Sequence, residues 1–415
     1  MQLYVSIAVF IFSALALVVS SGYSIGLVML LSGCVFLLSK KNKTSDKISN
    51  EALLLILGLL FYFLVNFSLN LIHGARLAEY DAPSRFALFI PVFFLLRRFP
   101  PSARFFWGGI AAGAIAAGFF SGWQFFSVAN TRADGFTNAI QFGNISILFG
   151  ILCAAGIGWA VLQKQRGFWS FFLACGVVAG LLGSLFSESR GSWLALPVAL
   201  LFIGFAYCRV STHKRLFVGA VLALMLALTV AVSLPIFRGG ERIRLAVTEL
   251  QSYRATGDST TSVGARLEMW RTSLLLFPMR PLLGWGKEGY MEGTEQLVAA
   301  GKVRLVPGEH THPHNEYLDA LVKRGVGGLI ALLALYFIPL FIFSRHIRDK
   351  NPAVRPYAIA GASLVISYLC FGLTQSFLTH IIGVTEFILM LILLWSQLNF
   401  QQNARHSIEL NKSQG

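Results

Sequence analysis

Long apolar runs recur along almost the whole chain and limit its fold more than any other feature. Each run comes close to the ~20 residues that an α-helix needs to cross the hydrocarbon core of a bilayer. Charged residues make up only 13% of the 415 residues, against roughly a quarter in soluble domains. The sequence therefore predicts an all-α polytopic membrane protein with about 12 transmembrane helices, at residues 2–20, 22–39, 51–73, 84–98, 105–128, 137–162, 168–186, 192–208, 215–237, 325–344, 356–376 and 380–399.

The distribution of lysine and arginine predicts how these spans are oriented. The loops on one predicted side, together with the C-terminal tail, hold 18 of the 34 basic residues, and the short loops on the other side hold 4. The remaining 12 lie in the segment 238–324, which is too long for the rule to count. By the positive-inside rule both termini are cytoplasmic and the long segment lies outside. This pattern also argues against nucleic acid as the reason for the net charge of +15.

The segment 238–324 is expected to form a helical cap over the bundle. "RIRLAVTELQSYRA" and "ARLEMWRTSLLLF" have helical spacing, "TGDSTTSVG" between them is a polar linker, and "PLLGWGKEGY" is expected to be a turn-rich loop. A short helix then runs into "RGVGG", whose glycines can bend the chain into the next span. The predicted organisation is 1–237 for spans one to nine, 238–324 for the periplasmic loop, 325–400 for spans ten to twelve, and 401–415 for a cytoplasmic tail.

Three alternating histidines in the outer segment, His310, His312 and His314, have three possible explanations. Alternate positions on an extended chain could hold zinc, with Glu309 or Glu316 as further ligands. They could also be ordinary loop residues. The third possibility is that His314 is a general base, because Pro313 suits the first turn of a helix and a helix N-terminus disfavours the imidazolium. A neutral imidazole can take a proton from a hydroxyl.

Several other polar side chains are predicted on the outer side. Arg190 lies at the membrane boundary in "SESRGSW" and Arg266 begins an amphipathic helix. Each could reach lipid headgroups or a surface carboxylate, or could clamp an anion, since the planar guanidinium matches phosphate oxygens. Arg85 is a further candidate for phosphate binding. Asn66, Asn70 and His73 share one helix face and are expected either to line a substrate groove or to bond between helices.

Three stretches, taken in order, resemble the O-antigen ligase and polymerase superfamily of bacterial surface-polysaccharide enzymes. "SESRGSW" (187–193) resembles its Ser-Arg-Gly element, and "ARLEMWRTSLLLFPMRPLLGWG" (265–286) its arginine–tryptophan helix followed by Pro-Leu-Leu-Gly-x-Gly. "HNEYLDALVKRGVGG" (314–328) resembles its most specific element, which begins at the histidine. The resemblance implies a GT-C-like architecture. It is closest to the O-antigen ligases, since only one large outer loop is present.

The resemblance also implies a reaction. His314 would deprotonate a hydroxyl of the lipid A-core acceptor, which would attack the donor sugar with inversion, while Arg190 and Arg266 would neutralise the departing undecaprenyl diphosphate. No metal and no cofactor are expected, His310 and His312 remain loop residues, and membrane lipids are the other expected partners. The site would face the periplasm at the bacterial inner membrane. An O-antigen polymerase, a protein O-oligosaccharyltransferase and a transporter of lipid-linked glycans are the alternatives.

Overall fold

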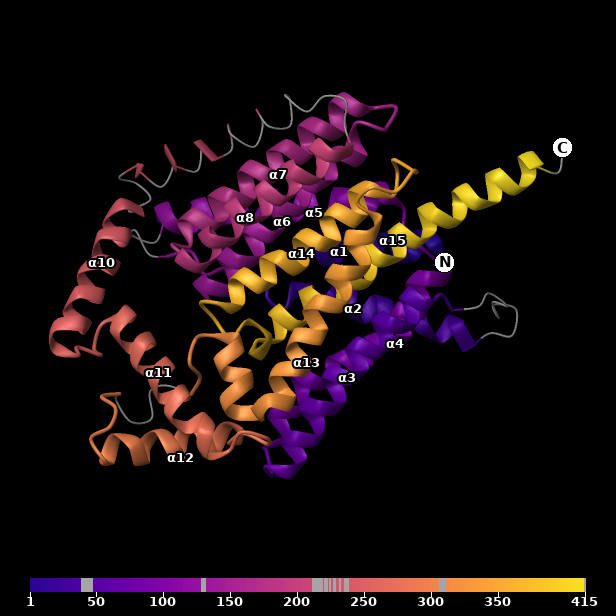
Figure 1. The fold of residues 1–415 in the computed structure, drawn as a ribbon. Coiled ribbons are helices and arrows are strands. Elements are labelled where there is room, and N and C mark those ends of the chain that lie inside the picture. Colours follow the sequence, from indigo (N-terminus) through magenta and orange to yellow (C-terminus); the bar gives the residue numbers. More distant parts are fainter. Residues whose placement is uncertain are drawn as a thin grey trace.

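The computed structural model describes residues 1–38, 48–127, 132–210, 239–305 and 311–413, with a few isolated residues between 211 and 238. The side chains of Arg190 and of residues 405–413 lie outside this description. All regular structure in the described residues is helical (Figure 1). The α-helices are α1 (Gln2–Leu15), α2 (Gly22–Gly33), α3 (Asn50–Ile72), α4 (Asp81–Arg98), α5 (Ala103–Ser127), α6 (Ala139–Ala160), α7 (Arg166–Phe186), α8 (Arg190–Val210), α10 (Gly239–Thr256), α11 (Ser262–Leu276), α12 (Gly286–Ala299), α13 (Glu316–His346), α14 (Arg355–Gly372) and α15 (Ile381–Ser413).

The predicted all-α membrane fold is confirmed. Seven helices within the described residues are long and apolar enough to cross a bilayer, namely α3, α5, α6, α7, α8, α13 and α15, and two shorter apolar helices occupy 2–15 and 22–37. Each predicted span except the ninth contains a helix of the structure. The ninth span, at 215–237, falls largely outside the described residues.

The centre of the bundle is formed by α6, α14 and α15. The apolar windows of α6 and α15 are 89% and 94% buried, and α14 packs against α6, α8, α13 and α15. Large side chains pack against these helices, as where Phe93 of α4 stacks on Trp395 of α15 at 4.5 Å between ring centroids. Because these helices are apolar on every side, they fit the interior of the bundle and not its lipid-facing surface.

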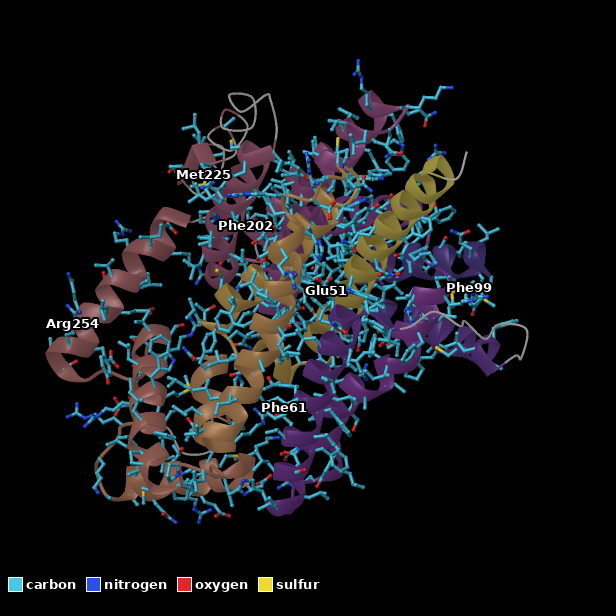
Figure 2. All side chains as sticks on the ribbon, turned by 45° about the vertical axis from the view of Figure 1, so that its right-hand side comes forward. Glu51, Phe61, Phe99, Phe202, Met225 and Arg254 are labelled. Carbon is cyan, nitrogen blue, oxygen red and sulfur yellow. The ribbon has the colours of Figure 1, made fainter. Side chains whose placement is uncertain are left out.

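Helices α10, α11 and α12, which we call the cap, lie together beside one end of the bundle (Figure 1). Arg254 on α10 marks the outer edge of the cap in Figure 2. A polar hydrogen bond joins α10 to α11, from Tyr253 to Glu268, and α11 and α12 both pack on α13. We call the end of the bundle that they meet the cap end.

The cap differs from expectation at "PLLGWGKEGY". The turn at Pro281–Trp285 is present, but Gly286 begins α12, which was not predicted. Glycines at 286, 289 and 293 lower helix propensity by up to about 1 kcal/mol each, so the local sequence argues against a helix here. The contact of Gly293 with Leu276 and Trp285 shows what overrides it, since a larger residue would keep α12 from packing this closely on α11.

Two further boundaries differ from the predictions. Pro313 does not occupy the first turn of a helix, because α13 starts at Glu316 with Asn315 as its N-cap. The segment 401–415 was expected to be a tail separate from the last span, but α15 continues through it as far as Ser413. This extension of α15 was not predicted because its residues are polar on both faces, and a membrane span is recognised in a sequence by its apolar residues.

A break in α13 connects the cap to the bundle. Gly325 has φ 64° and ψ −165°, a conformation that interrupts the helix and that side chains rarely adopt. In a continuous helix the carbonyl of Val322 would accept from the amide of Val326. Here Val322 accepts from the amide of Trp285, at 3.0 Å, and Val326 donates to the carbonyl of Pro281, at 2.9 Å. The 281–285 turn thus satisfies the backbone groups that the break sets free.

Gly325→Ala is expected to lower the free energy of unfolding by at least about 2 kcal/mol. This positive-φ, extended conformation is essentially restricted to glycine and alone costs another residue about 1–3 kcal/mol, and a Cβ here would also overlap the Leu282 carbonyl. The control is Gly327→Ala, two residues along the same helix, where a Cβ would meet nothing. Thermal unfolding in detergent and proteolysis at Arg280 measure the two effects. Equal stability of the two variants would contradict this account of the break.

Candidate active site

His314 lies at the cap end, immediately before the N-cap of α13. Asn315 accepts hydrogen bonds from the amides of Tyr317 and Leu318, each at 3.0 Å, and so fixes the start of the helix. His314 itself has a φ of 50°, a conformation uncommon for residues other than glycine. The neighbouring carbonyl of Pro313 accepts from the indole of Trp270 at 3.0 Å. The surrounding bonds therefore hold the backbone of His314 in a conformation that it would not choose alone.

The ring of His314 is oriented by Gln375, a residue that is only 3% exposed. The Nδ1 atom of His314 lies 2.5 Å from the Oε1 atom of Gln375, and an amide oxygen can only accept. Nδ1 therefore donates, so in the neutral ring Nε2 is the nitrogen without a proton. The Nε2 atom of Gln375 in turn lies 3.1 Å from Nε2 of His380, to which it donates. The amide thus bridges two imidazoles and fixes the tautomer of each.

His312 and His380 complete a group of three imidazoles. The ring centroids of His312 and His314 are 4.3 Å apart, and those of His312 and His380 are 6.4 Å apart. Burial, and then the charge of neighbouring His314, lower the pKa of His312 to about 4. Burial also lowers the pKa of His380. Both rings are therefore neutral near pH 7. His312 lies in a loop, as expected, but it is partly buried there.

The metal interpretation of the histidines finds no geometric support in the described part of the chain. There, no cluster of three or more histidine, cysteine, aspartate or glutamate side chains is placed to hold an ion. His310 and Glu309 lie outside the described residues. Glu316, the other expected ligand, is buried and accepts from the amide of Leu378 at 2.8 Å, so its role in the structure is to fix the loop after α14.

Arg266 lies on the face of α11 that meets the His314 loop. It is half-buried and precedes Trp270 by one helical turn, so the two side chains share a face. Because the indole of Trp270 bonds to Pro313, this face is directed at the residues before His314. Glu268, on another face, is held by the amide of Arg304 at 2.9 Å and by Tyr253.

The backbone of Arg190 is also brought to this region, although its side chain lies outside the described residues. Arg190 begins α8, and the next residue, Gly191, packs so closely on Thr374 that a Cβ would overlap the threonine side chain. Thr374 immediately precedes Gln375, the partner of His314. Glu188, in the turn before α8, pairs with Arg242 of the cap. The loop 373–380 therefore lies between the start of α8 and His314.

Arg85 is not brought to His314 by any contact of the structure. Its guanidinium bonds to both carboxylate oxygens of Asp81, at 3.2 and 3.3 Å, and to the hydroxyl of Thr385 at 3.1 Å. These bonds join α4 to α15 and favour a role in packing. Binding of a diphosphate by Arg85 remains a prediction from the sequence alone.

Sequence reasoning missed Gln375 and His380. The signal was present, because "LTQSFLTHI" places both polar residues at the facing ends of the last two predicted spans, 356–376 and 380–399. Polar residues near a membrane surface are ordinarily explained as parts of a solvated loop. The sequence does not show that this loop reaches His314, which lies 61 positions before Gln375. Only the packing of α13 on α14 brings them together.

Comparisons with known proteins find two relatives and one family model. A family model described as O-antigen ligase matches residues 175–333, a range that contains all three motifs. A protein of Haemophilus influenzae with no assigned function is 29% identical over 378 residues, 91% of this chain and 94% of the relative. An O-antigen ligase of Escherichia coli K12 is 26% identical over 224 residues, 53% of this chain and 51% of the relative, so that match spans about half of each protein. The chain is therefore similar to the O-antigen ligases in its ordered motifs, over residues 175–333 of the family model and over about half of the Escherichia coli protein.

Proposed function

We propose that this protein is an O-antigen ligase, an inverting glycosyltransferase that moves a glycan from undecaprenyl diphosphate to the lipid A-core oligosaccharide. The observation that carries the proposal is the hydrogen bond between Nδ1 of His314 and Gln375, which leaves Nε2 as the basic atom of an oriented imidazole. A general base needs this combination of fixed direction and correct tautomer. The family match supports the reaction class.

In the proposed reaction, Nε2 of His314 takes the proton from an acceptor hydroxyl as its oxygen bonds to the anomeric carbon of the donor sugar. The bond from that carbon to the diphosphate oxygen breaks, and the electron pair leaves with undecaprenyl diphosphate. Attack opposite the leaving group inverts the anomeric configuration. Arg190 and Arg266 are assigned to the negative charge that grows on the diphosphate, where preorganised positive charge is most effective.

The proposed location follows from the charge distribution of the sequence. Both termini are assigned to the cytoplasm of a bacterial inner membrane, and the cap and His314 to the periplasmic face. The donor and acceptor lipids would both reach the site from the bilayer. The proposal requires no metal or cofactor, because two guanidinium groups supply the positive charge that a divalent ion provides in other phosphate-handling enzymes.

His314→Ala is expected to lower transfer by about 10²–10⁴-fold, the usual contribution of a general base. Arg266→Ala is expected to lower it by about 10²–10³-fold, as for loss of one charge-stabilising donor. The assay supplies purified protein with an undecaprenyl-diphosphate glycan and rough lipopolysaccharide, in the presence of EDTA. Arg254→Ala, an exposed arginine of the same cap, is the control and should retain transfer.

Full activity of His314→Ala would remove the base assignment. Lengthening of donor chains without lipid A-core would identify a polymerase in place of a ligase.

Gln375→Glu is expected to move the acidic side of the pH–activity profile upward by about 1–2 pH units. A carboxylate beside Nδ1 stabilises the imidazolium, so the base loses its proton, and becomes active, only at higher pH. Gln375→Leu removes the orienting bond and should lower kcat with little change in the KM for the donor. Rates measured from pH 5 to 9 separate this positioning role from a merely structural one. An unshifted profile in Gln375→Glu would show that the amide does not act through His314.

A further inference from the structure

A pocket of about 330 Å³ opens next to the three histidines, between α3, α4 and the first turns of α13. Its volume is at the lower end of the roughly 300–1,000 Å³ typical of small-molecule sites. His312 and His380 form part of its wall, and Gln375 joins His380 to His314. The rings of His312 and His380 therefore lie between the pocket and His314, the proposed base.

Buried polar atoms in this pocket have no partner within the described structure. Asn66 is 1% exposed, and although its amide nitrogen donates to the Tyr62 carbonyl at 2.7 Å, its Oδ1 atom accepts nothing there. The Nε2 atom of His312 is likewise buried and unbonded among the described residues. Most buried polar atoms are bonded in folded proteins, so two unbonded ones on residues that line the same cavity favour a ligand there.

The remaining wall has the chemistry that a sugar ring needs. Asp319 is fully buried, between the ammonium of Lys323 at 2.5 Å and the guanidinium of Arg324 at 3.6 Å. All three line the pocket and offer both acceptors and donors to hydroxyl groups. Tyr62 and Phe86, with ring centroids 4.6 Å apart, add aromatic surface. A pyranose ring has matching groups, because its hydroxyls lie at its edge and its apolar C–H groups lie on its faces.

The pocket and Arg266 lie on different sides of α13. Figure 1 shows α13 between α3 and α11, and the view in Figure 2 agrees. The pocket is on the α3 side, whereas Arg266 is on α11. Inversion requires the acceptor hydroxyl to approach opposite the leaving diphosphate, so a pocket across α13 from Arg266 fits an acceptor better than a donor.

We propose that this pocket binds an acceptor sugar next to the one that carries the attacked hydroxyl, and so selects the acceptor. The inference rests on the proposed transfer reaction and adds to it the acceptor subsite. Asn66 is assigned to hydroxyl recognition, the ion-paired Asp319 to a further hydroxyl, and Tyr62 with Phe86 to the apolar face of the ring.

The test compares two variants that fill the pocket from different helices. Asn66→Leu on α3 and Ala82→Leu on α4 are each expected to raise the KM for rough lipopolysaccharide at least tenfold and to leave the KM for the donor unchanged. Ser68→Leu, the same kind of change on the exposed face of α3, is the control and should alter neither constant. An unchanged acceptor KM in both folded variants would overturn the proposal. A raised donor KM would overturn it as well, and would assign the pocket to the donor.

A binding experiment separates failure of the pocket from failure of the proposed reaction. Lipid-free core oligosaccharide is added to His314→Ala protein, and binding is followed by ligand-observed nuclear magnetic resonance. Binding that is lost in the His314→Ala/Asn66→Leu double variant supports the pocket even if the wild-type protein transfers no glycan to lipid A-core. Binding that is equally strong in the double variant, or absent from His314→Ala itself, overturns it.

Discussion

The backbone exchange at Gly325 is the interaction on which the position of the proposed active site depends. At the break in α13, Val322 and Val326 bond to Trp285 and Pro281 in place of each other. These bonds join the cap to α13, the helix that follows His314 and enters the bundle. Asn315, Trp270 and Gln375 can therefore act on a start of α13 that is already fixed in space. The two glycines at 284 and 325 permit this approach, since a Cβ on either would overlap the opposing backbone.

The site is assembled from four segments that are distant in sequence. Arg266 lies on α11, the backbone of Arg190 begins α8, Gln375 and His380 lie in the loop 373–380, and His314 lies just before the N-cap of α13. The loop is the common neighbour, because Thr374 meets Gly191 and Gln375 meets His314. The proposed base is oriented by a neutral amide, whereas many enzymes use a carboxylate for this purpose. An amide fixes the ring without adding a negative charge beside a diphosphate.

Patterns that depend on short-range physics were predicted well from the sequence. Apolar length located the spans, and the glycines of "RGVGG" indicated the bend that the structure places at Gly325. The helix of Arg266 and the polar linker before it were also correct in outline. The features that were not predicted depend on tertiary contacts. Helix α12 is stabilised by Leu276 and Trp285 against the preference of its glycines, and the pairing of His314 with Gln375 has no local signature. Asn66, Asn70 and His73 were recognised as one face, and all three line the pocket, but only the fold shows what lies opposite them.

The break at Gly325 also separates two mechanical parts of α13. The nine residues from Glu316 to Arg324 are held by the cap and by the loop after α14, whereas the residues that follow belong to the bilayer-embedded bundle. A membrane helix responds to changes in lipid thickness by tilting. We therefore expect a tilt of the inner part to change the backbone angles at Gly325, where α13 is already non-helical. A continuous helix would pass the same tilt on to His314 as a rigid rod.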